Sequence, residues 1–164
     1  MKTDAFEPHA HEHCIVDALQ AAEQLCSTRG VRLTDIRRRV LELVWESHQP
    51  LGAYGILDRL TAEGHKPAPP TVYRALDFLL EQGLVHRIAS LNAYMGCADP
   101  AHQHLACFFL CETCGNAEEL EDSHALMQAL KASADKRGFR IRLPMLEIGG
   151  ICRQCQADTE KAGD

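Results

Sequence analysis

The most informative stretch of this sequence is residues 69–87, which read PPTVYRALDFLLEQGLVHR. Two prolines open the stretch, and proline is tolerated in the first turn of a helix because its missing N–H would have no partner there. Apolar residues then recur at helical spacing and share one face, which comprises Val72, Ala75, Leu76, Leu79 and Leu80. The pattern predicts a helix over 71–83 that points Arg74 away from the core, near the helix N-terminus.

Upstream of this helix, the sequence predicts three more helices. Apolar residues at helical spacing indicate one near residues 14–29, which ends at Gly30. A second follows Thr34, a residue type suited to the N-cap position. The third spans about 53–63, and the proline-rich segment KPAPP that follows it must be extended or a turn.

Downstream, two short strands are predicted around residues 84–89 and 93–96, joined by a turn. Short helices followed by a hairpin describe a winged helix-turn-helix, a DNA-binding module whose recognition helix enters the major groove. On this interpretation Thr71 and Arg74 face double-stranded DNA, and Arg74 is placed to pair with the edge of a guanine. The alternative is a small helical bundle with a solvated arginine.

From about Leu105 the pattern changes to that of a small α/β domain. A buried strand, ACFFLC, is followed by the strand NAEEL, an amphipathic helix near 123–137 and a final segment, FRIRLPMLEIGG. So small a domain is expected to need a metal and a partner subunit for stability. The chain is therefore predicted to be α+β, with an N-terminal tail (1–13), a winged-helix domain (14–96), a hinge (97–104), an α/β domain (105–157) and a C-terminal tail (158–164).

The net charge of −6 argues by itself against a nucleic-acid binder, because affinity for phosphates comes mainly from Lys and Arg. The charge is uneven, however: residues 29–94 carry nine Lys or Arg against seven Asp or Glu, whereas both flanking segments are acidic. This distribution is typical of a DNA-binding module inside an acidic protein. The chain has no export signal and no apolar run long enough for a bilayer, so we expect a cytoplasmic protein without a membrane partner.

The chain has eight cysteines, and four of them form two CxxC pairs, CETC at 111–114 and CRQC at 152–155. Cytosolic thiols are kept reduced, so metal or redox chemistry is expected in place of disulfides. Four thiolates suit tetrahedral zinc in a structural site. This predicts a four-cysteine zinc site made of Cys111, Cys114, Cys152 and Cys155. A thioredoxin-like redox pair and two disulfides are the alternatives, and neither explains why the pair occurs twice.

A second, looser set of possible metal ligands combines one thiol, two imidazoles and a carboxylate, a mixture that favours zinc over magnesium, calcium or manganese. It consists of His86, Cys97, His104 and Glu119, with His102, Cys107, Glu118 and His124 as nearby alternatives. Each of these residues also has an ordinary structural explanation, as a surface histidine, a core cysteine or a solvated strand end. The residue pattern alone leaves both interpretations open.

Together, the stretch 69–87 and the later CETCG and ICRQC motifs resemble the ferric uptake regulator family, and most closely its zinc uptake regulator branch. The resemblance covers nearly all of residues 15–156. It implies a winged-helix domain hinged to an α/β dimerisation domain, with structural zinc on the four CxxC cysteines. The family's DNA-contacting tyrosine and arginine fall on Tyr54 and Arg74. The regulatory zinc ligands that it implies are His86, Cys97, His104 and Glu119.

Two departures from the family pattern affect these expectations. The second helix begins Thr-Asp-Ile-Arg at residues 34–37, where relatives commonly have Thr-Pro-Gln-Arg, and we expect no loss of fold. The loop 97–104 is about one residue shorter than in close relatives, which leaves His102 as a rival of His104. A third metal site, to which His124 could contribute, is an open alternative.

The resemblance implies a zinc-responsive repressor of zinc uptake genes. It would be a homodimer that binds double-stranded operator DNA, holds two zinc ions per chain, and is not an enzyme or a binder of any small molecule besides metal. Within the same family, the alternative is a sensor of iron, manganese, nickel or peroxide. Cys97 argues against it, because a thiolate is a poor partner for hard cations. A thiol oxidoreductase that uses the CxxC pairs is the alternative from another class.

Overall fold

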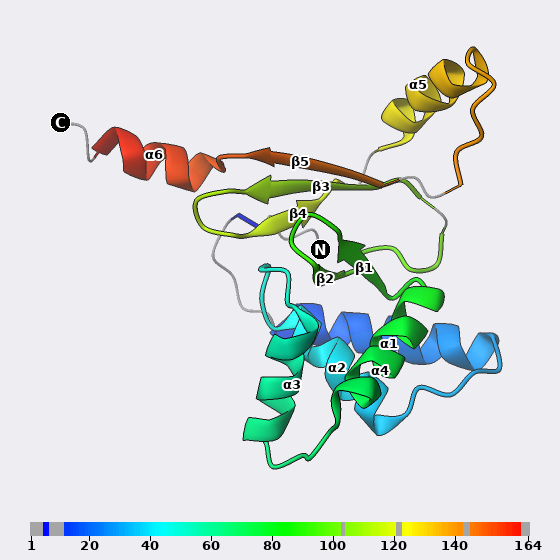
Figure 1. The fold of residues 1–164 in the computed structure, drawn as a ribbon, viewed down its shortest axis with the longest axis vertical. Helices are drawn as coiled ribbons and strands as arrows, with labels where there is room; N and C mark the ends of the chain where they lie inside the picture. Colours follow the sequence, from blue (N-terminus) through cyan, green and yellow to red (C-terminus); the bar gives the residue numbers. More distant parts are fainter. Residues whose placement is uncertain (1–4, 7–11, 103, 121–122, 143–144, 162–164) are drawn as a thin grey trace.

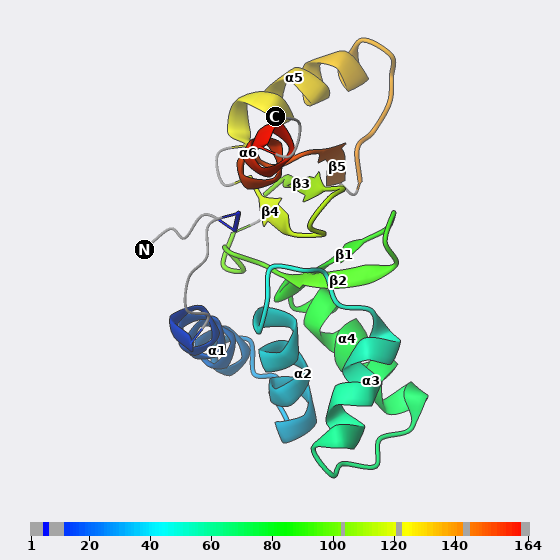
Figure 2. The ribbon, with the colours of Figure 1, turned by 90° about the vertical axis from the view of Figure 1, so that its left-hand side faces the viewer.

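The structure is a computed structural model that describes residues 5–6, 12–102, 104–120, 123–142 and 145–161 (Figure 1). Two units lie one against the other. The N-terminal unit, residues 12–96, holds four helices and a hairpin, and the C-terminal unit, residues 105–161, holds a sheet and two helices. Figure 2 shows the hairpin lying between the N-terminal helices and the sheet. The predicted α+β class, with a winged helix-turn-helix followed by a small α/β unit, is confirmed.

The helices of the N-terminal unit are α1 (Glu12–Thr28), α2 (Asp35–Trp45), α3 (Ala53–Ala62) and α4 (Pro69–Glu81). Helix α4 begins two residues before the predicted position, with both prolines inside its first turn. Thr34 occupies the N-cap of α2, although its side chain makes no capping hydrogen bond. The apolar faces of all four helices meet in one core, whose largest fully buried members include Leu41, Leu43, Ile56, Leu60, Leu76 and Leu79.

The hairpin consists of β1 (Val85–Ile88) and β2 (Ala93–Gly96), paired antiparallel so that His86 lies opposite Met95. A bridge between Leu51 and Tyr94 ties it to the segment before α3. Gly96 is required for close packing against α2, because a Cβ there would lie 2.2 Å from the ring of Trp45. The hairpin is thereby fixed against the helical core, as the wing of a winged helix.

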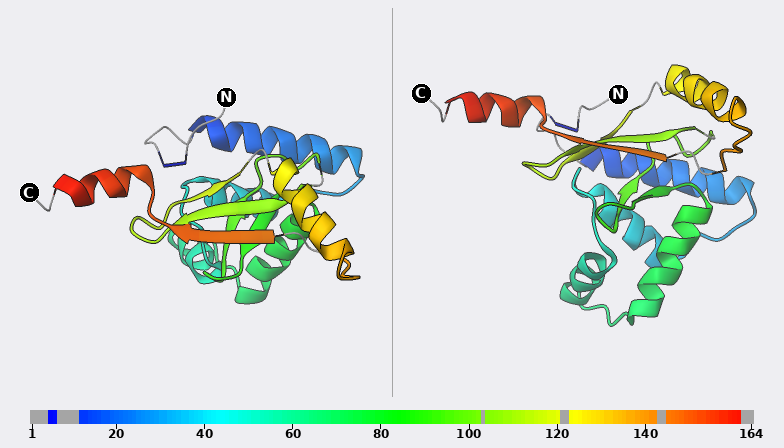
Figure 3. Two further views of the ribbon diagram at one scale, coloured as in Figure 1. Left: turned by 90° about the horizontal axis from the view of Figure 1, so that it is seen from above. Right: turned by 45° about the horizontal axis from the view of Figure 1, so that its top comes forward.

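The sheet of the C-terminal unit has the order β4-β3-β5. Its strands are β3 (Ala106–Cys111), β4 (Ala117–Glu119), antiparallel to β3, and β5 (Met145–Gly150), parallel to β3. The crossover between β4 and β5 contains helix α5 (His124–Asp135), and helix α6 (Arg153–Lys161) follows β5. Figure 3 shows α6 projecting beyond the sheet, away from α5. No helix in the described part of the chain is long and apolar enough to cross a membrane.

The two predicted tails differ from the structure. Helix α6 extends to Lys161, whereas a tail was expected from residue 158. Helix α1 begins at Glu12, and Ala5 is buried with its carbonyl accepting a hydrogen bond from the side chain of Asn116 at 3.2 Å. Residues 5–6 therefore dock on the C-terminal unit. His9 and His11 lie outside the described residues, and His13 is exposed.

One face of the three-stranded sheet packs against the hairpin, and the strand register shows which side chains lie on it. Phe108 on β3 is paired with Glu119 on β4 and with Glu147 on β5, so these three side chains leave the same face. Phe108 is completely buried and clusters with Ile88 and Met95 of the hairpin. This apolar contact joins the two units.

Candidate metal centres and DNA-facing surface

The hairpin supplies the first two members of a cluster between the units. The N–H of Cys97 donates to the carbonyl of Leu84 at 3.0 Å, which extends the hairpin pairing by one step beyond β2. Residues 86 and 97 consequently lie on the same face of the hairpin, since side chains alternate along each strand. Both side chains face the sheet, where the His86 ring packs edge-on against Phe108 at a centroid distance of 5.4 Å.

The strands of the C-terminal sheet position the other two members. Glu119 ends β4 and is buried, and His104 lies just before β3. The Nε2 atom of His104 is 2.7 Å from Oε1 of Glu119 and 3.8 Å from Sγ of Cys97. One ligand atom from each of His86, Cys97, His104 and Glu119 lies within 4.8 Å of the others. The structure therefore brings together the four residues that the family resemblance implied.

The contacts inside this cluster fit a bound cation. The Nε2 of His86 lies 3.2 Å from the same Glu119 oxygen that His104 approaches, yet it makes no hydrogen bond of acceptable geometry. Among the described residues, it is the one buried side-chain nitrogen or oxygen without such a partner. Burial, and next the charge of Glu119, raise the pKa of Cys97 to about 12. A zinc ion would satisfy the free ring nitrogen and stabilise a thiolate beside the carboxylate.

Contacts around the cluster orient its members. The backbone carbonyl of His102 contacts Nδ1 of His104 at 2.9 Å, which directs Nε2 of that ring into the cluster. The second oxygen of Glu119 accepts the N–H of Ala98 at 3.1 Å. The ring of His102 lies elsewhere: its side chain is 78% exposed and contacts Asp99. The geometry thus favours His104 over His102.

The other alternative ligands stay outside this cluster. Cys107 is completely buried, whereas His124 is exposed at the start of α5. Neither these two residues nor Glu118 belong to a group of three or more potential ligands within the described residues. The third metal site has no geometric support among the described residues.

The four CxxC cysteines form a second cluster in the C-terminal unit. One Sγ atom from each lies within 4.8 Å of the others, and all four are free thiols. The N–H of Cys152 donates to Sγ of Cys111 at 3.3 Å. Burial raises the pKa of Cys111, but N–H groups of Cys114, Cys152 and Thr113 outweigh it and lower the value to about 6. Convergence of both pairs on one point suits tetrahedral zinc and is not expected of two separate redox pairs.

The four-cysteine cluster also contacts more distant parts of the chain. Phe6 packs against it, close to the buried Ala5. On the other side, Gln49 of the N-terminal unit donates its side-chain amide to the carbonyl of Cys114 at 2.9 Å. The N–H of Ala117 also donates to the carbonyl of His48 at 2.8 Å. These contacts between distant segments leave no periodic signal in the sequence.

The residues predicted to contact DNA lie on α3 and α4. Tyr54, at the start of α3, is 68% exposed, and Arg74 on α4 is also exposed. Thr71 is half-buried at the N-terminal end of α4. Tyr73 is also exposed, beside Arg74. The helical periodicity of residues 71–83 predicts this exposure, because Tyr73 lies outside the apolar face. The surface of α4 is therefore free to approach a partner.

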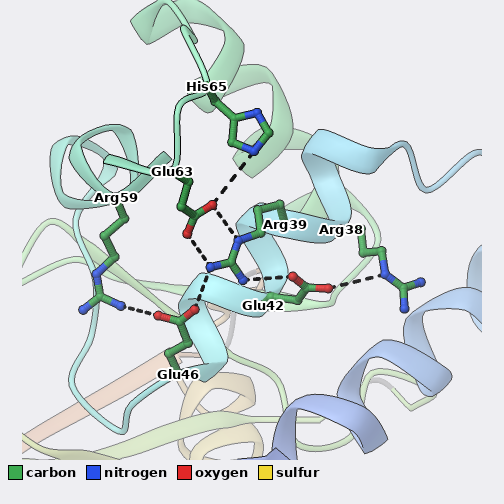
Figure 4. A network of polar contacts seen from close by, with 7 residues as sticks. All are labelled: Arg38, Arg39, Glu42, Glu46, Arg59, Glu63 and His65. Atoms are coloured by element: carbon green, nitrogen blue, oxygen red, sulfur yellow. Dashed lines mark hydrogen bonds and ion pairs between the residues drawn. The ribbon is translucent and has the colours of Figure 1, made fainter. Parts of the chain in front are cut away.

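Several of the nine basic residues of segment 29–94 are held in an internal ion-pair network (Figure 4). Arg39 contacts three carboxylates, those of Glu42 in α2, Glu46 at the end of α2 and Glu63 at the end of α3. Arg59 pairs with Glu46 at 2.8 Å, and Arg38 pairs with Glu23 and Glu42. These arginines stabilise the packing of the helices. The basic bias of the segment therefore overstates the charge available to DNA.

A family model described as the ferric uptake regulator family matches residues 28–148. The chain belongs to the ferric uptake regulator family. The zinc uptake regulation protein of Escherichia coli (strain K12) is 39% identical to this family member over 140 residues. Those residues are 85% of this chain and 81% of that protein.

Solved structures of relatives share the fold. A zinc uptake regulator complexed with zinc and DNA superposes with a TM-score of 0.83 at 37% identity, covering 89% of this chain and 97% of that one. Holo XcZur gives a TM-score of 0.77 at 43% identity, covering 86% and 98%, whereas apo XcZur gives 0.50 at 42%, covering 87% and 97%. At nearly equal identity, this chain superposes more closely on the holo form than on the apo form.

Proposed function

We propose that this ferric uptake regulator family member is a zinc-responsive transcriptional repressor of zinc uptake genes. In this proposal a homodimer binds double-stranded operator DNA in the cytoplasm and has no catalytic reaction of its own. A winged-helix domain (14–96) reads the DNA, a dimerisation domain (105–157, continued by α6) pairs the subunits, and residues 97–104 form the hinge. The 39% identity to a zinc uptake regulation protein supports this function.

The observation that carries the proposal is the cluster between the units. His86 and Cys97 come from the hairpin side, and His104 and Glu119 come from the sheet side, yet their ligand atoms lie within 4.8 Å of one another. A zinc ion there would supply the positive charge that links all four. Because the ligands belong to both units, occupancy would favour the one relative orientation that brings them together. The higher structural similarity to the holo form of a relative than to its apo form supports the same relative orientation of the two units.

The ligand set supports zinc over the other metals that family members sense. Cys97 offers a soft thiolate, which is a poor ligand for manganese and is prone to oxidation beside iron. Two imidazoles and one carboxylate complete a four-ligand set of the kind that zinc accepts. We further propose a second, structural zinc on Cys111, Cys114, Cys152 and Cys155, which gives two ions per chain.

DNA recognition is assigned to the exposed side of α3 and α4. Arg74 is proposed to contact a base edge, Thr71 the DNA near the N-terminus of α4, and Tyr54 the DNA beside the preceding helix. In a twofold dimer, the relative orientation of the units fixes the distance between the two recognition helices. Half-sites lie about one helical turn, roughly 34 Å, apart. Zinc would thus control operator affinity through the relative orientation of the two units.

Fluorescence anisotropy tests zinc control directly. The labelled duplex is one that the zinc-loaded protein selects from a randomised library, and it is titrated with protein in zinc or in a strong chelator. Allosteric couplings of about 1 to 3 kcal/mol per site correspond to roughly 5- to 150-fold in affinity, so a large difference is expected. Equal affinity in zinc and in chelator, with the four-cysteine site still loaded, would reject the proposal.

Metal stoichiometry tests the two sites separately. We expect two zinc ions per chain after purification and one after mild chelation, because the four-thiolate site is more closed. Cys97→Ser should remove the exchangeable ion and leave the tightly held one. A variant that still binds two ions would contradict the assignment of the regulatory site.

A further inference from the structure

A further polar contact between the two units lies at the turn of the hairpin, at the opposite end from Cys97. The carboxylate of Glu147 on β5 bridges two consecutive backbone donors in this turn. Its Oε1 accepts the N–H of Ala89 at 2.6 Å, and its Oε2 accepts the N–H of Ser90 at 3.0 Å. Hydrogen bonds to an ionised acceptor are stronger than neutral ones. The side chain of Glu147 therefore binds the backbone of the hairpin turn directly.

The sheet register places this contact in a row with the metal cluster. Glu119, Phe108 and Glu147 are aligned across β4, β3 and β5 on the face that meets the hairpin. Glu119 accepts the N–H of Ala98 at the hinge end of the hairpin, and Phe108 packs against Ile88 in the middle. The hairpin is consequently held at both ends by carboxylates from opposite edges of the sheet. Only the hinge end carries proposed metal ligands.

The turn itself makes the two donors available. The N–H of Asn92 donates to the carbonyl of Ala89 at 3.2 Å, which closes the turn and leaves the N–H groups of its first two residues directed outward. Burial opposes charge on Glu147, but hydrogen bonds from the Ser90 side chain and from both backbone donors lower its pKa below the usual value. The carboxylate is thus ionised at neutral pH and matched to the donors of the turn.

We propose that Glu147 is a positioning residue that anchors the wing to the dimerisation sheet and thereby raises the affinity for both zinc and DNA. This inference rests on the proposed function. When the turn is held, His86 and Cys97 stand beside His104 and Glu119, so the contact at Glu147 and zinc favour the same posture. By linkage, whatever stabilises that posture raises the affinity for zinc and for DNA together.

Glu147→Gln and Ser90→Pro test the two sides of the contact. Glutamine keeps the size of the side chain but has one carbonyl acceptor and no charge. Ser90 is the second residue of the turn, a position that favours proline, so the substitution removes both the N–H and the hydroxyl of this residue and keeps the turn. Asp135→Asn, at an exposed carboxylate of α5, is the matched control for loss of one negative charge.

The readouts are the zinc affinity of the exchangeable site, by competition with a chromophoric chelator, and anisotropy with the library-selected duplex. We expect Glu147→Gln to lower zinc affinity about tenfold and operator affinity at limiting zinc by a similar factor. Loss of a negative charge by itself favours DNA binding, so Asp135→Asn should leave operator affinity unchanged or slightly higher. The double variant should bind zinc within about twofold of Glu147→Gln, since both substitutions disrupt one contact.

The role of Glu147 is overturned if Glu147→Gln keeps both affinities within about twofold of the wild type. A fall in melting temperature alone would also overturn it, because that result marks a purely structural contact. Fully additive effects of the two substitutions would contradict a shared contact. If the wild type itself binds DNA equally with and without zinc, the proposed function fails instead, and the zinc-affinity arm still decides the role of Glu147.

Discussion

At the scale of single residues, the two histidines of the loop before β3 differ in what they contact. His104 directs Nε2 toward Glu119 and Cys97, whereas His102 is exposed and contributes its backbone carbonyl. We expect His104→Ala to abolish binding of the exchangeable zinc, because it removes one of four ligands. His102→Ala keeps the backbone carbonyl that orients His104, so it should change zinc affinity by less than about threefold. Competition with a chromophoric chelator measures both variants, and the reverse order would exchange the two assignments.

Arg74 is the side chain on α4 that we expect to carry sequence recognition. Its side chain is exposed, so Arg74→Ala should leave the melting temperature nearly unchanged. Loss of a bidentate contact with a base costs about 1 to 3 kcal/mol, or roughly 5- to 150-fold in operator affinity. Anisotropy with the library-selected duplex measures the loss. Arg140→Ala, an exposed arginine of the C-terminal unit, is the control and should bind within about twofold of the wild type.

At the scale of elements, the packing of the hairpin on α2 depends on a single glycine. A Cβ at Gly96 would lie 2.2 Å from the Trp45 ring, so Gly96→Ala must displace either the ring or β2. Overpacking of this kind costs about 1 to 3 kcal/mol of unfolding free energy. Chemical denaturation of the zinc-loaded protein tests it. At Gly52 a Cβ would meet its nearest neighbour at 3.8 Å, and Gly52→Ala should cost less than about 1 kcal/mol.

The ion-pair network of α2 and α3 predicts a dependence of stability on pH. The pKa of Glu63 is lowered below the usual carboxyl value, and the largest cause is hydrogen bonding from Arg39. A lowered folded-state pKa contributes stability above the unfolded-state pKa, and that contribution is lost as the pH falls through the folded-state value. Arg39→Met should therefore lose about 1 kcal/mol at neutral pH, a small figure because solvent screens the pair. Urea denaturation between pH 3 and pH 7 should show a shallower pH dependence in the variant, and an unchanged slope would contradict the assignment.

The helices and strands with clear apolar periodicity could be predicted from the sequence, because burial of one face is a local property of the chain. Helix α6 was missed altogether, since the polar segment RQCQADTEK has no apolar face to signal it. The metal ligands could be proposed by type and by resemblance. The choice between His102 and His104 required the fold, because it depends on which ring reaches Glu119. The contact of Glu147 with the hairpin turn could not be predicted either. It joins a side chain to backbone groups nearly sixty residues away, and no local pattern encodes such a contact.

At the scale of the whole molecule, a single chain leaves apolar side chains of the C-terminal unit exposed. They lie on β3, after α5, on β5 and just before α6, and they are Phe109, Phe139, Met145, Ile148 and Ile151. Helix α5 likewise has no buried residue in the single chain. A second copy of the chain would cover this surface, in keeping with the proposed homodimer.

Ile148→Asp should disrupt that dimer, because it would bury an unpaired carboxylate in the contact between subunits. We expect the dissociation constant to rise by at least about 100-fold, which corresponds to about 2.8 kcal/mol. Light scattering coupled to gel filtration at micromolar concentration measures the change. Leu91→Asp alters an apolar residue of similar exposure on the hairpin turn and should remain dimeric. A dimeric Ile148→Asp protein would place the subunit contact elsewhere.

The docking of Phe6 and Ala5 on the four-cysteine cluster has a practical consequence for work with this protein. Residues near the start of the chain cover thiols contributed by residues near its other end. A shorter side chain at residue 6 would open this cover. We therefore expect Phe6→Ala to lose its tightly held metal to EDTA faster than the wild type.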